Sequence, residues 1–137
     1  MRRKPEMPIA LGLGCDRGTP ATTIARCIAE ALALAKARLA DVRAVASIDL
    51  KADEIGLAEV AQANGWHIRF YPATELATVE VPNPSATVRK YTGTPSVSEA
   101  AAILVAGADQ THLIIEKYKL RGQDGRNATV SIARIPQ

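Results

Sequence analysis

The sequence predicts a single α/β domain: a mixed, mostly parallel sheet of about five strands, with helices packed on it and a C-terminal β-hairpin. The first 48 residues give a strand, a helix and a strand in that order, which favours a parallel pair with a right-handed crossover. Two apolar runs near the C-terminus flank a polar, glycine-containing segment, as in an antiparallel hairpin. Because 137 residues suffice for one core, residues 1–137 are expected to form one domain.

The first half of the chain predicts a buried strand, a long helix and a second buried strand. The strand begins at Ile9 and breaks into a glycine-bearing turn. Apolar residues then recur at helical spacing, which predicts an amphipathic helix over residues 20–37. We expect Thr19 to cap this helix and Pro20 to occupy its first position, where a missing N–H costs nothing. The apolar run Val42–Ile48 predicts the second strand.

The second half predicts shorter elements, which follow from apolar spacing and from the glycines and prolines between them. In order, they are a helix over 57–63, a half-buried strand over 66–71, a helical turn over 73–76, a helical piece over 85–91, a helix that starts near Val97 and ends at Gly107, and strands over 113–119 and 128–135. Two prolines exclude regular helix from residues 81–85. The polar segment 121–127 joins the last two strands into the hairpin.

Composition argues against several classes of protein. The three basic residues of an N-terminal arm over residues 1–7 account for the formal charge of +3, since the other 14 basic residues are balanced by the 14 acidic residues of the chain, Glu6 of the arm included. Five aromatic residues and a neutral body do not give the basic, aromatic surface that binds nucleic acid. No run approaches the ~18 apolar residues of a membrane span, and no signal peptide precedes the first strand. We therefore expect a cytoplasmic protein with neither nucleic-acid nor membrane partners.

A candidate site lies in the turn after the first strand. It is not a dinucleotide fingerprint, because the third glycine stands at residue 18 rather than 17, and the phosphate-loop Lys-Ser/Thr pair is missing. The turn could still bind the carboxylate of a ligand, because it has the N–H groups of a helix start and one guanidinium as hydrogen-bond donors. The alternative is a turn whose glycines only ease packing, and the two interpretations are evenly matched. The residues concerned are Gly14, Cys15, Arg17, Gly18 and Thr19.

The two cysteines, Cys15 and Cys27, are too far apart for a Cys-x-x-Cys pair, and no histidine arrangement suggests a metal site. A helix N-terminus and Arg17 would lower the pKa of the Cys15 thiol and make it a nucleophile. Neither His67 nor His112 has a recognisable spacing to it as a base. We therefore favour a small, partly buried thiol at Cys15, and we expect Cys27 to fill the core.

An acidic segment follows the second strand, where Asp49, Asp53 and Glu54 surround Lys51. The carboxyl ends of parallel strands share one edge of a sheet, so this segment should lie near the turn that carries Arg17. The carboxylates are candidate general bases, and the alternative is a solvated loop that neutralises its own charge. Lys51 among carboxylates should stay protonated, which argues against a Schiff base.

A Gly-Thr-Pro segment occurs twice, and the second copy begins at Gly93. Either Thr94 or Ser96 would cap the helix that follows it. If both helix N-termini reach the same sheet edge, Thr19 and Thr94 would frame a pocket with hydrogen-bond donors on two sides. The alternative is that Gly-Thr-Pro is merely a convenient way to start a helix.

Four segments in order cover nearly the whole chain: Gly12-Leu-Gly-Cys-Asp-Arg-Gly-Thr19, Ser47-Ile-Asp-Leu-Lys-Ala-Asp-Glu54, Val81-Pro-Asn-Pro-Ser85 and Gly93-Thr-Pro-Ser-Val-Ser-Glu-Ala-Ala101. Together they resemble the family formed by the CobE proteins of cobalamin biosynthesis and the carboxyl-terminal domain of CbiG. No single segment is diagnostic, but four in order are fairly specific. The sequence lacks the part of CbiG that precedes the shared domain, which points to the stand-alone CobE of the aerobic route.

The resemblance implies a role in building the corrin ring, with a precorrin as the small-molecule partner. A precorrin carries several acetate and propionate groups, which helix N-termini, threonine hydroxyls, Arg17, Lys51 and Lys117 would hold. Asn83 and Ser85 of the third segment join the expected ligand contacts, as do Gly93, Thr94 and Ser96 of the fourth. No metal and no cofactor are expected.

Three hypotheses about activity remain open. The first is a binding module for a corrin precursor. The second, implied by CbiG, is a hydrolase that opens the ring-A lactone of a (cobalt-)precorrin with loss of acetaldehyde. There Asp49, Asp53 or Glu54 would activate water, and the N–H groups of residues 14–19 would hold the oxyanion. The third is a protein that assists a methyltransferase of the same pathway by contact.

Overall fold

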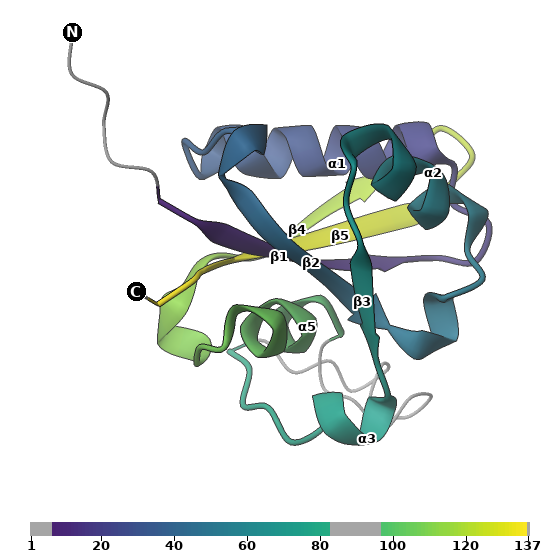
Figure 1. The fold of residues 1–137 in the computed structure, drawn as a ribbon. Helices are drawn as coiled ribbons and strands as arrows, with labels where there is room; N and C mark the ends of the chain where they lie inside the picture. Colours follow the sequence, from purple (N-terminus) through teal and green to yellow (C-terminus); the bar gives the residue numbers. More distant parts are fainter. Residues whose placement is uncertain (1–6, 83–96, 137) are drawn as a thin grey trace, which may run out of the picture.

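The computed structural model describes residues 7–82 and 97–136, which form one five-stranded sheet between two layers of helix (Figure 1). The strand order is β3-β2-β1-β5-β4. The bounds are β1 Ile9–Cys15, β2 Val42–Ile48, β3 Ile68–Tyr71, β4 Leu113–Arg121 and β5 Asn127–Arg134. The first three strands run parallel, and β5 is antiparallel to both of its neighbours. Four strands therefore share one direction, and the predicted mixed sheet with a C-terminal hairpin is confirmed.

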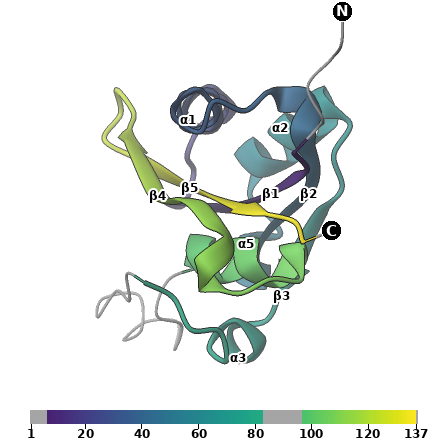
Figure 2. The same ribbon diagram turned by 90° about the vertical axis from the view of Figure 1, so that its left-hand side faces the viewer.

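Helices α1 (Ala21–Leu34) and α2 (Ile55–Asn64) cover one face of the sheet, while α5 (Val97–Ala106) and the single turn α3 (Ala73–Leu76) lie on the other (Figures 1 and 2). Three short 3-10 turns complete the described part: η1 (Leu39–Asp41), η2 (Asp49–Lys51) and η3 (Gln110–His112). Each of these α-helices corresponds to a predicted one, and Gly65 and Gly107 end α2 and α5 in the left-handed conformation that favours glycine. Within the described residues, no helix is long and apolar enough to cross a membrane.

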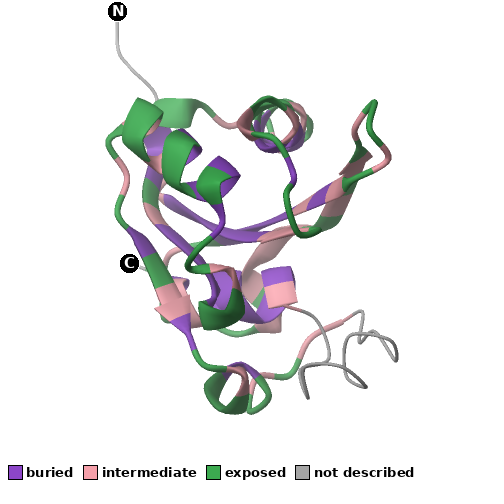
Figure 3. Ribbon diagram, turned by 90° about the vertical axis from the view of Figure 1, so that its right-hand side faces the viewer, coloured by how far each residue is buried: buried purple, intermediate pink, exposed green. Residues whose placement is uncertain are grey.

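The two faces of the sheet carry side chains of different size because residues alternate along β1. Large residues such as Ile9, Leu11 and Leu13 face α1 and α2 and form the main core. The small residue Ala10 packs instead against α5, so that helix lies directly on the strand. Figure 3 shows the result, with the central strands largely buried between helices whose outer faces are exposed.

The start of α1 differs from the prediction. The structure places Pro20 at the N-cap with extended backbone, and the cap receives no side-chain hydrogen bond. Thr19 is buried, and its hydroxyl lies 2.7 Å from the carbonyl oxygen of Asp16, to which it donates. The hydroxyl therefore closes the preceding turn, and the predicted capping role of Thr19 is wrong. The helix also ends at Leu34 rather than residue 37.

Candidate functional site

The candidate site begins at the turn that joins β1 to α1, residues 16–20, at the carboxyl end of β1. Gly18 adopts φ +80°, a conformation that side chains disfavour, so glycine suits this position. Its N–H donates to Glu54 Oε1 at 3.0 Å. Glu54 comes from the start of α2, far along the chain. The acidic segment therefore lies beside the turn, as the shared edge of parallel strands predicted.

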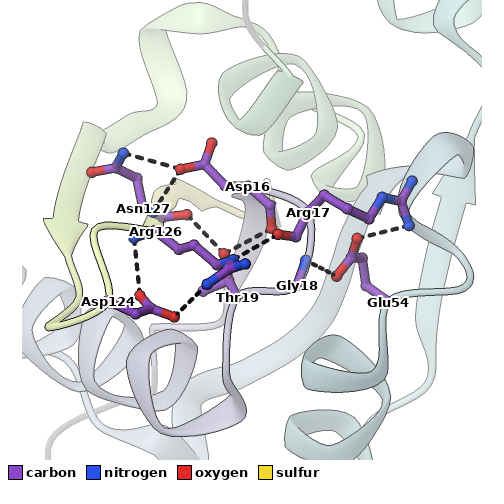
Figure 4. Close-up of polar contacts among 8 residues, drawn as sticks. All are labelled: Asp16, Arg17, Gly18, Thr19, Glu54, Asp124, Arg126 and Asn127. Atoms are coloured by element: carbon purple, nitrogen blue, oxygen red, sulfur yellow. Dashed lines mark hydrogen bonds and ion pairs between the residues drawn. The ribbon is translucent and has the colours of Figure 1, made fainter.

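Arg17 is held by that acidic segment. Its Nη1 lies 2.7 Å from Asp53 Oδ1 and 2.7 Å from Glu54 Oε2, and its Nη2 donates to the Leu50 carbonyl at 3.1 Å. Only 3% of the Glu54 side chain is exposed, so one of the two carboxylates is buried against the turn (Figure 4). The hydrogen bond from Arg17 is also the main cause that lowers the pKa of Asp53. Two carboxylates thus neutralise the guanidinium.

The start of β5 braces the other side of the turn. The Asp16 carboxylate accepts hydrogen bonds from the backbone N–H and the side-chain amide of Asn127, at 2.7 and 3.0 Å. Arg126 Nε donates to the Arg17 carbonyl at 3.0 Å, and its guanidinium pairs with Asp124 (Figure 4). The turn is therefore fixed from two directions by segments that are far apart in sequence.

A pocket of about 480 Å³ opens between this turn, the end of β2, the start of α5 and strand β4. That volume is within the range of small-molecule sites. Its lining comes from six elements and the turn between β1 and α1: Gly14, Cys15, Asp16, Arg17, Ile48, Leu50, Lys51, Val97, Ser98, Lys117, Lys119, Asn127 and Thr129.

Three lysines give the pocket its charge. Lys51 lies in η2 after β2, while Lys117 and Lys119 lie on β4. None of the three forms an ion pair with another described residue, in contrast to Arg17. Asp16 is the one carboxylate of the lining, and it already holds Asn127. Among the described residues, the positive charge of the pocket that no carboxylate pairs with therefore resides on its lysines.

The floor of the pocket is a row of residues across three strands. Gly14 of β1 faces Thr129 of β5, which in turn faces Lys119 of β4. A Cβ at Gly14 would lie 2.5 Å from Thr129 Oγ1, so a side chain there would crowd the floor. The missing side chain keeps this part of the pocket open.

Cys15 lines the pocket as a neutral thiol. Burial raises the pKa of its thiol to about 11, and this outweighs the opposing effect of the nearby Lys51 and Arg17. The low-pKa nucleophile is therefore wrong, and the partly buried thiol is confirmed. Cys27 is fully buried in the main core, as predicted.

The structure brings together only part of the predicted site. Five of the predicted residues line the pocket, namely Gly14, Cys15, Arg17, Lys51 and Lys117. Five others lie outside the lining: Gly18, Thr19, Asp49, Asp53 and Glu54. Asn83, Ser85, Gly93, Thr94 and Ser96 lie outside the described residues. The prediction missed eight residues of the lining: Asp16, Ile48, Leu50, Val97, Ser98, Lys119, Asn127 and Thr129.

The missed residues differ in whether the sequence carries a signal for them. Lys119 stands two residues after Lys117, and alternate residues of a strand share a face, so its position was open to prediction. Asn127 and Thr129 enter the pocket only because β5 is antiparallel to β1, which places the start of β5 beside the end of β1. No local sequence pattern predicts that β5 pairs with β1. Among the described residues, no group of histidine, cysteine and acidic side chains is arranged to hold a metal ion.

Fold and site define a class of protein: an α/β domain with a basic, partly apolar pocket where β1 ends. The model of the family "Cobalamin synthesis G C-terminus" matches residues 9–133. The chain is 42% identical over 128 residues to the cobalt-precorrin-5A hydrolase of Priestia megaterium, and 39% identical over 111 residues to the protein CobE of a Sinorhizobium species. It belongs to the CbiG C-terminal family and is a cobalamin biosynthesis protein of the CobE and CbiG type.

Solved structures agree with this assignment. The crystal structure of CobE, a protein from the cobalamin biosynthetic pathway, superposes with a TM-score of 0.76 at 30% identity, covering 99% of this chain and 96% of that one. A cobalamin biosynthesis protein from Agrobacterium tumefaciens gives 0.67 at 29% identity, over 94% and 99% of the two chains. The match spans 93% of this chain but only 32% of the Priestia hydrolase, against 80% of this chain and 71% of the Sinorhizobium protein.

Proposed function

We propose that this domain binds a precorrin through the pocket at the end of β1. The observation that carries the proposal is the convergence of Lys51, Lys117 and Lys119, none of them in an ion pair among the described residues, on one pocket of about 480 Å³. Lysine ammonium groups held apart from carboxylates attract an anionic ligand. A precorrin supplies several carboxylates around a largely apolar ring, and the family belongs to the pathway that builds that ring.

Arg17 has a different role in this proposal from the one the sequence indicated. Its guanidinium already has two carboxylate partners, so it fixes the rim of the pocket and positions Leu50. Asp53 and Glu54 likewise have a positioning role, since both pair with Arg17 and Glu54 also accepts a hydrogen bond from the turn. The binding of ligand carboxylates therefore depends on the lysines.

The proposal is tested by equilibrium titration with cobyrinic acid, a stable corrinoid whose peripheral carboxylates are free. We expect binding, and we expect Lys51→Gln to weaken it by about fivefold, the effect of losing one charge-assisted contact worth about 1 kcal/mol. Lys36→Gln is the matched control, because Lys36 is exposed beyond the end of α1 and does not line the pocket. Absence of binding, or an equal effect of both substitutions, would overturn the proposal.

A second candidate function is hydrolysis of a precorrin lactone, favoured by the 42% identity to a cobalt-precorrin-5A hydrolase. Water would add to the lactone carbonyl, and the acyl C–O bond would break to give a carboxylate and a hydroxyl. The carboxylate in the pocket that is placed to take the proton from water is Asp16, since Asp49, Asp53 and Glu54 lie outside the lining. This function requires that the purified chain open a lactone substrate and that Asp16→Asn abolish the reaction without loss of binding.

A further inference from the structure

The pocket has two chemically different ends, and the strand order sets them apart. Ile48 ends β2 and is followed in η2 by Leu50 and a single lysine, Lys51, whereas two lysines, Lys117 and Lys119, lie on β4. In the order β2-β1-β5-β4 these ends are three strand spacings apart, about 14 Å at ~4.8 Å per strand. The floor residues Gly14 and Thr129 lie on the two strands between them.

The basic end is a two-lysine row on β4. Lys117 and Lys119 are two residues apart and point to the same face of the sheet, which sets their backbones about 7 Å apart. Both side chains line the pocket, and neither forms an ion pair with another described residue. Two separate carboxylates can therefore be held at once, which a single lysine does not achieve.

The β2 end of the pocket, which carries one lysine against the two of β4, exposes a large hydrophobic side chain. Leu50 is 53% exposed although it is a leucine, and it lines the pocket with the buried Ile48 and with Val97 of α5. Its carbonyl is tied to Arg17, which holds this segment in place. An exposed apolar side chain that is fixed beside a pocket suits the apolar body of a ligand.

We infer that Lys117 and Lys119 are the specificity-determining residues of this pocket, selecting tetrapyrroles by the number of their carboxylates while Leu50 and Val97 receive the apolar ring irrespective of it. This inference rests on the proposed function and deepens it. Once one carboxylate is bound to one lysine, a second carboxylate on the same ring meets the other lysine at a high effective concentration. The selectivity therefore grows with the number of carboxylates that reach β4.

The test uses three porphyrins with the same type of ring and different peripheral acids: a dicarboxylate, a tetracarboxylate and an octacarboxylate. For each porphyrin we measure Kd with the unmodified chain and with the variant Lys117→Gln/Lys119→Gln. We then compare among the three porphyrins the ratio of the variant's Kd to that of the unmodified chain. We expect a ratio of about twofold for the dicarboxylate and at least about tenfold for the octacarboxylate. Taking this ratio cancels differences in ring hydrophobicity among the porphyrins.

Two further variants separate the two ends of the pocket. Leu50→Asn should weaken all three porphyrins by a similar factor, because the ring is common to them. Lys36→Gln, remote from the pocket, should leave every ratio near one and so controls for net charge. Unfolding midpoints of all variants establish that each is folded.

The outcomes distinguish the inference from the function on which it rests. A ratio that is the same for all three porphyrins, or porphyrins that fail to bind while cobyrinic acid binds, would overturn the selection by β4 and leave the proposed function standing. If neither cobyrinic acid nor any porphyrin binds, the proposed function itself fails.

Discussion

The protonation state of Cys15 shows how a single residue in this pocket depends on its surroundings. The neighbouring cations Arg17 and Lys51 favour the thiolate, and burial disfavours it. Burial has the larger effect, so the pKa rises to about 11 rather than falling. The sequence displays the cations but not the depth of burial, which is why the nucleophile hypothesis was open before the structure.

We predict that Cys15 alkylates slowly at neutral pH and that its rate increases until the pH reaches about 11. A rise in pKa from 9.0 to about 11 lowers the thiolate fraction at neutral pH by about a hundredfold, and the thiolate is the reactive form. The measurement is peptide-resolved labelling with iodoacetamide, with urea-unfolded protein as the reference. Cys27, whose pKa burial raises to about 12, is the internal control and should react more slowly still. Labelling of native Cys15 faster than in urea would contradict this prediction.

Part of the site was predictable residue by residue, and part was not. Gly14, Arg17 and Lys51 follow from the rule that loops after parallel strands gather at one edge. Thr19 illustrates the limit, because the same hydroxyl suits a helix cap or a turn, and only the position of the Asp16 carbonyl decides between them. The local sequence shows which hydrogen-bonding groups a residue has, whereas the tertiary fold decides which atoms those groups contact.

At the scale of elements, the approach of α5 to β1 builds the roof of the pocket. A Cβ at Gly12 would lie 1.9 Å from the Ser98 carbonyl oxygen and 2.6 Å from the Ala102 nitrogen, both backbone atoms that cannot rotate away. The first turn of α5 also supplies Val97 and Ser98 to the lining. The position of α5 above the pocket therefore depends on the absence of a side chain at Gly12.

We predict that two glycine substitutions on β1 affect different properties of the protein. Gly12→Ala should lower the free energy of unfolding by about 1–3 kcal/mol or more, because α5 must move. Gly14→Ala meets only the rotatable side chain of Thr129, so it should change stability less but weaken cobyrinic acid binding by narrowing the floor. Urea unfolding and titration of both variants decide the matter, and the prediction is wrong if Gly14→Ala is the more destabilising.

The connection from α1 to β2 gives a pH-dependent prediction. Asp41 is buried and accepts hydrogen bonds from the backbone N–H and the side chain of Arg38, at 2.9 and 3.2 Å. The backbone hydrogen bond is the main cause that lowers its pKa below the ordinary 3.8. A carboxyl whose pKa is lower in the folded state stabilises the fold above its unfolded pKa and loses that effect as the pH falls through the folded value.

We therefore expect Asp41→Asn to be less stable than the unmodified chain at neutral pH, with the difference shrinking as the pH is lowered to about 3. Urea unfolding at several pH values measures it. Asp49→Asn is the matched control, since Asp49 is exposed and forms no ion pair with another described residue. A difference that stays constant down to that pH would show that the charge of Asp41 is not the cause.

Elements were predicted better than their contacts. The strands and helices of the described chain follow from apolar spacing, and β2 has the bounds expected for it. The close packing of α5 on β1 was not predicted, because α1 and α5 are both rich in alanine and the sequence does not show which of them lies on the small residues of β1. Small residues in a strand indicate that a helix packs closely against it. Which helix does so depends on the strand order of the sheet and on the face that each helix covers.

For the whole molecule, the central feature is that the pocket is assembled from segments spread over most of the chain. Four parts of the chain meet only in the complete sheet: the end of β1 with the first residues of the turn (14–17), the segment 48–51, the start of α5, and the β4–β5 hairpin. The antiparallel β5 next to β1 brings the hairpin to the carboxyl edge of the parallel strands. A ligand that contacts several of these segments binds the folded state and not the unfolded chain.

Ligand binding should therefore raise the thermal stability of the whole domain. At a free concentration of cobyrinic acid 100 times its Kd, linkage gives about 2.7 kcal/mol, which is a shift in Tm of about 5–10 °C for a domain of this size. Because the lysines are the charged contacts, the shift should shrink when salt reduces the Debye length from ~10 Å towards ~3 Å. Differential scanning calorimetry at low and high salt measures both effects.

The variant that replaces Lys51, Lys117 and Lys119 by glutamine separates this mechanism from unspecific stabilisation. Its own Tm should remain close to that of the unmodified chain, because none of the three lysines forms an ion pair with a described residue. At the same ligand concentration its shift should be small and independent of salt. If the triple variant keeps the full, salt-sensitive shift, the anion site lies elsewhere on the molecule, and the lysines of this pocket are not what holds the carboxylates.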